Sequence, residues 1–433
     1  MPIPNRTTAA HYHYHVYNYA GSAPFQLSAA MGVAGHQMQF YSLFQDLQQL
    51  VIEANAKNMN AMLLPILPPT NPGRRPILVL RFGGGGPNRR VLFTGGIHGR
   101  ERIAVEMPYL IAEYLIKNYP DPAAAAAPTA RELVIRRLVD HRQIFVAPML
   151  NPDGHTHATL HDRNWRINRR AFVRAVDFHL NNGYSIAAPN LRYFANQHNP
   201  PPGAPSPRQI DFDPNNVTAG VDLNRNFPGP KWGYECYHHV GNPPLRITSG
   251  DPVARVPERD TYFGPFVNSE PETQAVMQLF AFGPFLASID YHSYAQMILY
   301  PERARRDGDV KRMAQCLHWL IGDGAGNNYA YGRASQLLYP AFSSVMDYSY
   351  QTAPHGLLAR KPYAFTVELD PALGAAPGFN WPENQILNTF RKNIRGALAL
   401  LACAGKYLVR IGTPQCCGQF ANWDVYNHGN DLP

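Results

Sequence analysis

The stretch RVLFTGGIHGRE, from Arg90 to Glu101, joins an apolar segment to a histidine and an acidic residue. The apolar residues predict a strand, and the two glycines end it. The residues from Arg102 to Tyr119 have apolar side chains at i+3 and i+4 spacing, which predicts an amphipathic helix. A buried strand followed by such a helix is typical of α/β folds, in which functional side chains gather at the carboxyl ends of strands.

The segments on either side continue this pattern of strands and helices. Their positions follow from apolar periodicity and from the Gly and Pro residues that separate the elements. This order predicts an α/β sheet with helices on its faces. The further predicted strands are Ile77 to Phe82, Gln143 to Leu150, Phe285 to Asp290, Met297 to Tyr300 and Ala364 to Leu369, and the further predicted helices are Phe44 to Asn55, Arg131 to Asp140, Glu270 to Phe280, Lys311 to Ile321 and Trp381 to Ala404.

The size and composition of the chain predict a folded protein with a large core. Of its 433 residues, 45% are hydrophobic and 16% are charged, which excludes disorder caused by excess charge. No apolar run is long enough to span a bilayer. The first twenty residues contain no apolar segment of a signal peptide. We therefore expect a cytoplasmic protein without membrane association, and a mature secreted form remains an alternative.

The five cysteines do not suggest a disulfide framework in a chain of this length. Cys416 and Cys417 are adjacent, and Cys236, Cys316 and Cys403 are isolated. We therefore expect a reduced protein, as is usual in the cytosol.

The formal net charge of +8 leaves two interpretations open. The arginines are scattered, without the basic block or the interleaved aromatic residues of a nucleic-acid-binding module, so we expect no nucleic-acid partner. The positive charge then belongs either to a solvated basic surface or to several arginines that line one site for an anionic substrate.

Two histidines and two acidic residues are predicted at the ends of strands. His98 and Glu101 follow the predicted strand that begins at Arg90. His292 follows the strand that ends at Asp290, and Glu368 lies near the end of the strand from Ala364 to Leu369. Two histidines and one glutamate with a fourth position open form a catalytic zinc set. A lone histidine is more often a hydrogen-bonded core residue, and the His-x-x-Glu spacing alone is a weak signal. Glu368 is different, because an ionised glutamate in a buried strand needs a cation or a partner.

Eight short motifs occur in order between Gly73 and Ala404, and together they resemble the zinc metallocarboxypeptidases of the carboxypeptidase A/B type. One such string would be weak, whereas eight in order are a strong signal. The motifs are GGIHGRE (95–101), NPDG (151–154), NWRINR (164–169), GVDLNRNF (220–227), SEPET (269–273), DYHSYAQMILYP (290–301), SSVMDYSY (343–350) and FTVEL (365–369).

The resemblance implies one Zn²⁺ ion per chain, bound by His98, Glu101 and His292. Asp222 matches the residue that orients His98 by accepting the proton of its other ring nitrogen. The metal would lower the pKa of a water molecule and polarise the carbonyl of the substrate.

The resemblance also implies roles in catalysis and in binding of the substrate terminus. Glu368 matches the general base, and Arg166 would stabilise the oxyanion. Asn224 and Arg225 match the pair that binds the terminal carboxylate of the substrate, over which Tyr339 would close.

Three further residues are implied to contact the substrate. Arg100 and Tyr294 look like residues that contact it further along its chain. Met346 matches the residue at the bottom of the pocket for the C-terminal side chain. Because methionine is apolar and adaptable, we expect a preference for aliphatic or aromatic C-terminal residues.

One catalytic domain is expected, with a mixed, twisted, about eight-stranded sheet flanked by helices on both faces. It would span residues 73–405, with residues 1–72 as an N-terminal extension packed on it and residues 406–433 as a C-terminal tail. The favoured function is a monomeric metallocarboxypeptidase acting on peptide or protein C-termini. One alternative is a related zinc amidohydrolase or deacylase acting on small acyl-amino acids or cell-wall peptides. A non-enzymatic binding module is disfavoured, because the chain keeps every ligand and the base.

Overall fold

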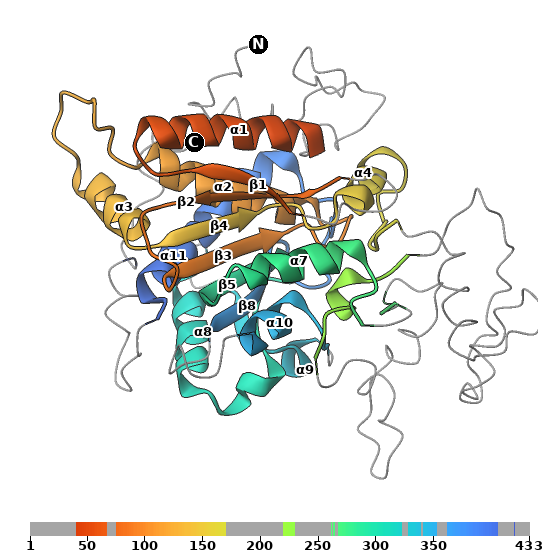
Figure 1. Ribbon diagram of the computed structural model, residues 1–433. Coiled ribbons are helices and arrows are strands. Elements are labelled where there is room, and N and C mark those ends of the chain that lie inside the picture. Colours follow the sequence, from red (N-terminus) through yellow and green to blue (C-terminus); the bar gives the residue numbers. More distant parts are fainter. Residues whose placement is uncertain are drawn as a thin grey trace, which may run out of the picture.

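A computed structural model describes residues 40–66, 75–169, 220–229, 261, 263–264, 267–322, 328–338, 341–352, 362–405 and 420. Within these residues an eight-stranded mixed sheet is covered by helices on both faces (Figure 1). The predicted α/β fold with about eight strands is therefore confirmed.

The sheet has the strand order β1-β2-β4-β3-β5-β8-β6-β7. The pairs β3–β4, β3–β5, β5–β8 and β6–β7 are parallel, and the pairs β1–β2, β2–β4 and β6–β8 are antiparallel. The neighbouring strands β3, β5 and β8 therefore end at the same edge of the sheet. The strands are β1 (Met62–Ile66), β2 (Ile77–Phe82), β3 (Arg90–Gly95), β4 (Gln143–Ala147), β5 (Phe285–His292), β6 (Met297–Tyr300), β7 (Ala330–Arg333) and β8 (Tyr363–Glu368).

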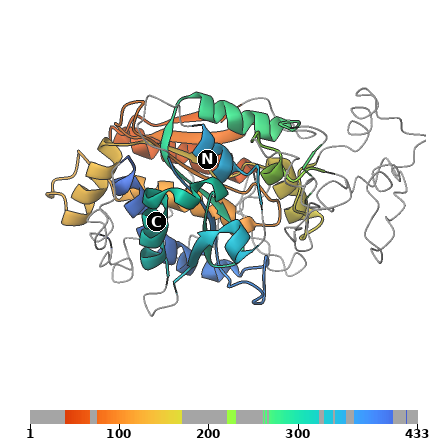
Figure 2. The same ribbon diagram turned by 90° about the horizontal axis from the view of Figure 1, so that it is seen from below.

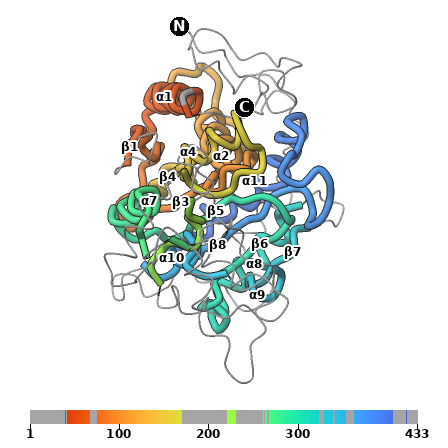
Figure 3. The backbone as a smooth tube through the Cα atoms, turned by 90° about the vertical axis from the view of Figure 1, so that its right-hand side faces the viewer, coloured from red at the N-terminus to blue at the C-terminus, as the bar shows by residue number. Residues whose placement is uncertain are grey.

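The helices form two layers, with α2, α8 and α11 on one face of the sheet and α7 and α10 on the other. Figures 2 and 3 show this separation, with α7 and α11 on opposite sides of the strands. Alternate residues of β3 explain it: Val91 and Phe93 belong to the core under α2, whereas Leu92 packs with α7. The helices are α1 (Phe40–Ala56), α2 (Arg102–Lys117), α3 (Ala130–Asp140), α4 (Pro152–Leu160), α7 (Pro271–Ala281), α8 (Gly308–Leu320), α9 (Ala334–Leu337), α10 (Val345–Gln351) and α11 (Ile386–Cys403).

All six predicted strands are present, and the two edge strands β1 and β7 were not predicted. The helices α4, α9 and α10 were not predicted either. The last helix begins at Ile386, five residues later than predicted, because a 3-10 turn at Glu383–Gln385 comes before it.

The described part of the N-terminal segment joins the same core. β1 pairs with β2 along its whole length, and Leu43 and Leu47 of α1 are buried with residues of α2. From the C-terminal segment, Phe420 is buried in this core as well. The remainder of both segments lies outside the described residues, and the domain boundaries at residues 72 and 405 stay a prediction.

Cys316 of α8 and Cys403 of α11 are both disulfide-bonded. The expectation that these isolated cysteines are reduced is wrong. Disulfide formation depends on the distance between two residues in the fold, which spacing along the chain does not reveal. Cys236, Cys416 and Cys417 lie outside the described residues.

Among the described helices, none has the length and apolar character needed to cross a bilayer.

Candidate active site

Three neighbouring parallel strands bring the predicted site together. His98 follows β3, His292 ends β5, and Glu368 ends β8. The pairing of β5 with β8 sets His292 directly opposite Glu368. The rule that sites lie at the carboxyl ends of strands therefore locates this group correctly.

His98, Glu101 and His292 form a compact, buried cluster. One ligand atom from each residue lies within 4.8 Å of the other two. Glu101 lies between the histidines, with its Oε1 2.7 Å from Nδ1 of His98 and its Oε2 3.0 Å from Nδ1 of His292. Two imidazoles and one carboxylate at such distances can close on a single metal ion.

The outer ring nitrogen of each histidine faces a second carboxylate. Nε2 of His98 lies 3.2 Å from Oδ1 of Asp222, and Nε2 of His292 lies 2.8 Å from Oδ2 of Asp290. An Nε2–H donated to a carboxylate leaves the Nδ1 lone pair facing the cluster, as metal ligation requires. The donor set and its outer partners therefore fit Zn²⁺.

Asp290 is a site residue that the sequence analysis missed. It lies two residues before His292 on β5, so both side chains point to the same face of the strand. Its other carboxylate oxygen accepts a hydrogen bond of 2.7 Å from the hydroxyl of Thr94. The i, i+2 spacing on a predicted strand was the signal that could have found it.

The electrostatics of the cluster favour a positive charge at its centre. Burial acts to raise the pKa of Glu101, but the adjacent histidines hold that pKa well below its usual value. Burial acts to lower the pKa of His292, but Asp290 and Glu101 hold that pKa well above its usual value. The carboxylate of Glu101 thus stays ionised between the two histidines, which suits a site for a divalent metal ion.

Arg166 and Asp222 connect the cluster to neighbouring loops. Nε and one terminal nitrogen of Arg166 donate to Oδ2 of Asp222 at 3.2 and 3.0 Å, and the other terminal nitrogen lies 3.4 Å from Oε1 of Glu101. Burial opposes the ionisation of Asp222, but Arg166, Arg225 and His98 hold its pKa well below the usual value. A charged donor is therefore fixed next to the metal ligands.

Asn224 and Arg225 lie on a short 3-10 helix, η3 (Leu223–Arg225), that Asp222 caps by accepting a hydrogen bond from the Asn224 N–H at 2.9 Å. The Asn224 side chain accepts a hydrogen bond of 2.9 Å from the Val345 N–H of α10. Its Nδ2 lies 3.3 Å from Nε2 of His292. Both residues of the predicted carboxylate-binding pair are therefore buried, and Asn224 contacts the metal cluster.

Arg100 and Tyr294 both contact Phe379, an aromatic residue that was not predicted to belong to the site. The Arg100 guanidinium lies 4.2 Å from the centre of the Phe379 ring, and the Tyr294 ring packs edge-on against Phe379 at 4.9 Å. Met346 is buried, with 4% of its surface exposed. Tyr339 lies outside the described residues.

Comparisons with known proteins identify the family. The model of the zinc carboxypeptidase family matches residues 72–396. The chain belongs to the zinc carboxypeptidase family, as its motifs suggested. Its cluster of His98, Glu101 and His292 suits the single zinc ion of this family of metallocarboxypeptidase hydrolases.

Individual relatives are distant. Carboxypeptidase A4 of Mus musculus is 26% identical over 76% of this chain and 62% of its own length. Carboxypeptidase B of Rattus norvegicus is 24% identical over 88% of this chain and 74% of its own length. The matched region thus spans less than two thirds of the first of these relatives.

Solved structures share the fold. Carboxypeptidase A from Helicoverpa armigera superposes with a TM-score of 0.57 and 21% identity, over 85% of this chain and 73% of that one. Bovine thrombin-activatable fibrinolysis inhibitor, in complex with tick carboxypeptidase inhibitor, also gives a TM-score of 0.57, with 20% identity over 90% of this chain and 98% of that one.

Proposed function

We propose that this chain is a zinc-dependent metallocarboxypeptidase that hydrolyses the C-terminal peptide bond of peptides. The observation that carries the proposal is the buried cluster of His98, Glu101 and His292, with Glu368 on the neighbouring strand. Membership of the zinc carboxypeptidase family supports it.

The residues around the cluster have complementary tasks in this reaction. When bound, the zinc ion supplies Lewis-acid chemistry, which polarises the scissile carbonyl and acidifies a water molecule. Glu368 takes a proton from the attacking water on a carboxylate oxygen and returns it to the nitrogen of the leaving amine. Arg166 donates to the oxygen that gains negative charge in the transition state. Its hydrogen bonds to Asp222 hold it in place beforehand.

Asn224 and Arg225 make the proposed reaction an exopeptidase reaction. A guanidinium group and a side-chain amide can together bind a free carboxylate, and a carboxylate at this position places the preceding peptide bond near the metal ligands. Closure of Tyr339 over the same carboxylate remains a prediction. An internal peptide bond has no free carboxylate next to it and would not be held in this position.

The predicted preference for apolar or aromatic C-terminal residues rests on Met346 and also remains a prediction. Met346 packs in the main core. It is not among the residues that line the cavity beside the site. The side chains that line that cavity favour a charged C-terminal residue instead, so the apolar preference becomes the alternative that a comparison of substrates decides.

The compartment and assembly of the protein are separate questions. The disulfide bonds at Cys316 and Cys403 favour an oxidising compartment over the cytoplasm, since such bonds are rare where thiols are kept reduced. A monomer remains the expectation.

Zinc content and activity test the proposed function together. We expect about one zinc ion per chain, hydrolysis of N-blocked dipeptides with a free C-terminus, and loss of this activity with a chelator that zinc restores. The matched control is the same dipeptide with an amidated C-terminus, which should hardly be cleaved. Equal cleavage of both forms would instead indicate an amidohydrolase that does not require a free C-terminal carboxylate on its substrate.

A further inference from the structure

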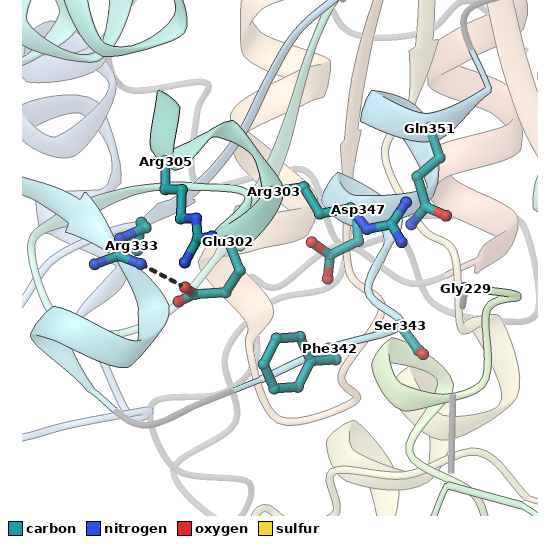
Figure 4. Close-up of a pocket in the computed structure, with 9 residues that line it drawn as sticks. All are labelled: Gly229, Glu302, Arg303, Arg305, Arg333, Phe342, Ser343, Asp347 and Gln351. Carbon is teal, nitrogen blue, oxygen red and sulfur yellow. Dashed lines mark hydrogen bonds and ion pairs between the residues drawn. The ribbon is translucent and has the colours of Figure 1, made fainter. Parts of the chain in front are cut away.

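A cavity of about 450 Å³ lies next to the beginning of α10 (Figure 4). One wall is the 3-10 helix η5 (Glu302–Arg306), which follows β6. The opposite wall is the segment that leads into α10. The residues lining the cavity are Gly229, Glu302, Arg303, Arg305, Arg333, Phe342, Ser343, Asp347 and Gln351. A space of this size accommodates one amino-acid side chain.

Hydrogen bonds connect one wall of the cavity to the carboxylate-binding pair. The Phe227 N–H donates to the Ser343 carbonyl at 3.2 Å, and the Val345 N–H donates to Asn224 at 2.9 Å. These bonds join η3, and Phe227 two residues after it, to the segment that carries Ser343 and Asp347 of the cavity lining. A substrate whose terminal carboxylate is held by Asn224 and Arg225 therefore has its C-terminal side chain beside this cavity.

Both acidic residues of the cavity already have partners. Glu302 accepts a hydrogen bond of 3.1 Å from Arg333 through Oε2 and one of 2.9 Å from the Ser335 N–H through Oε1. Asp347 accepts from the hydroxyl and the N–H of Ser344 at 2.8 and 3.4 Å, as part of the capping box of α10. Both carboxylates are therefore held by hydrogen bonds within the protein. The guanidinium group of Arg333 is likewise paired with Glu302.

Arg303 and Arg305 differ from the other charged residues of the lining. Within the part of the chain that the structure describes, neither guanidinium makes a hydrogen bond or an ion pair. Both side chains are exposed, and Figure 4 shows them extending from η5 at the cavity. The charged groups of this cavity that are left without a described partner are therefore cationic.

We propose that the cavity accepts the acidic side chain of a C-terminal Glu or Asp and that Arg303 is the residue that selects it. This inference rests on the proposed carboxypeptidase function. A guanidinium binds a carboxylate through two parallel N–H donors, so an acidic side chain satisfies Arg303 where an apolar one leaves it unpaired. A lysine side chain brings a like charge toward two arginines. The net positive charge of the chain allowed either a solvated basic surface or arginines that line a site for an anionic substrate. The proposed role of Arg303 favours the second.

The first test compares the wild-type enzyme on N-blocked dipeptides that differ only in the C-terminal residue. We expect kcat/KM for Glu to exceed that for its uncharged isostere Gln by about tenfold, because a hydrogen bond to a charged group is worth more than a neutral one. The preference should shrink at high salt, since Arg303 is exposed and its field is screened. A higher kcat/KM for Phe, Leu or Lys than for Glu would overturn the inference.

The second test is Arg303→Gln, with Arg306→Gln as its matched control. Arg306 lies on the same 3-10 helix and is exposed, but it does not line the cavity. Arg303→Gln should lower kcat/KM for the Glu substrate about tenfold and leave the Gln substrate within about twofold. Arg306→Gln should change neither value. Equal losses on Glu and Gln in Arg303→Gln would contradict the selection of charge.

The two proposals fail in different ways. If the zinc-loaded wild-type protein cleaves no free C-terminus, the carboxypeptidase proposal fails and the inference fails with it. If the enzyme cleaves peptides ending in Phe or Lys efficiently and those ending in Glu poorly, only the role of the cavity is wrong. Arg303→Lys adds a further check, because it keeps the charge and should retain part of the preference for Glu over Gln.

Discussion

Glu368 ends β8 opposite His292, at the edge where the metal ligands meet. Burial raises the pKa of Glu368 to about 7, with Glu101 and Asp290 acting in the same direction and His292 and Arg166 opposing them. A carboxyl group with a pKa near neutrality can both accept and return a proton within one reaction cycle. This pKa suits the proposed role of Glu368 as the general base.

The substitution Glu368→Gln should remove the proton acceptor without disturbing the fold. Glutamine has the same shape but cannot take a proton from water, so we expect kcat to fall by roughly 10²- to 10⁴-fold. Zinc content and melting temperature should match those of the wild type, which separates a chemical defect from a structural one. Turnover close to the wild-type rate would show that another group is the base.

Asp290→Asn should weaken metal binding through His292 without removing a ligand. Asp290 accepts from Nε2 of His292 at 2.8 Å and is itself held by Thr94. Loss of such an outer partner typically lowers metal affinity about 10- to 100-fold. Competition with a chelator measures the Kd for zinc, and Asp309→Asn on the surface of α8 is the control. An unchanged Kd would rule out this positioning role.

At the scale of elements, the central strands were predictable and the edge strands were not. β3 is a short apolar run buried on both faces, a pattern that stands out in the sequence. β1 contains Pro65 and is only partly buried, and β7 has two exposed residues among four. Such short edge strands gain their structure from the neighbouring strand rather than from their own pattern.

α7 contains a buried acidic residue that makes stability depend on pH. Burial raises the pKa of Glu272 to about 8, and the nearby Glu270 adds to the rise. The folded chain therefore binds a proton at Glu272 that the unfolded chain releases above its ordinary pKa of 4.5. Between these two pKa values the stability contributed by this group falls as the pH rises, and above pH 8 the loss is complete.

Glu272→Gln should remove this dependence. Glutamine keeps an acceptor for Asn168, whose Nδ2 lies 3.3 Å from Glu272, but carries no charge to bury. We expect the variant to match the wild type at pH 4 and to exceed it above pH 8, by on the order of 1 kcal/mol or more. Urea unfolding across this pH range measures the difference. A gap that is constant with pH would mean that Glu272 does not titrate as inferred.

At the scale of the whole molecule, the sequence predicted what lies in local motifs and missed what depends on packing. His98, Glu101 and His292 follow predicted strands, so a general rule about strand ends placed them together. Arg303 and Asp347 are distant in sequence, and only the packing of η5 against the start of α10 shows that they line one cavity. The disulfide bonds at Cys316 and Cys403 were missed for the same reason.

Those bonds lead to a prediction for the stability of the whole chain. Cys316 and Cys403 lie on α8 and α11, two helices that share the main core with the sheet. Reduction frees the unfolded chain from its cross-links, so we expect it to lower the free energy of unfolding by about 2–4 kcal/mol. The melting temperature with and without a reductant measures this, with a chelator present in both samples so that metal binding by the reductant has no effect.

A variant with all five cysteines replaced by alanine is the control for that experiment, because its melting temperature should not respond to the reductant. Thiol titration of the unfolded, unreduced wild-type chain should also detect fewer than five free thiols. If all five thiols titrate and reduction leaves the melting temperature unchanged, the cysteines are reduced after all. An oxidising compartment would then have no support, whereas the metal cluster, which contains no cysteine, would be unaffected.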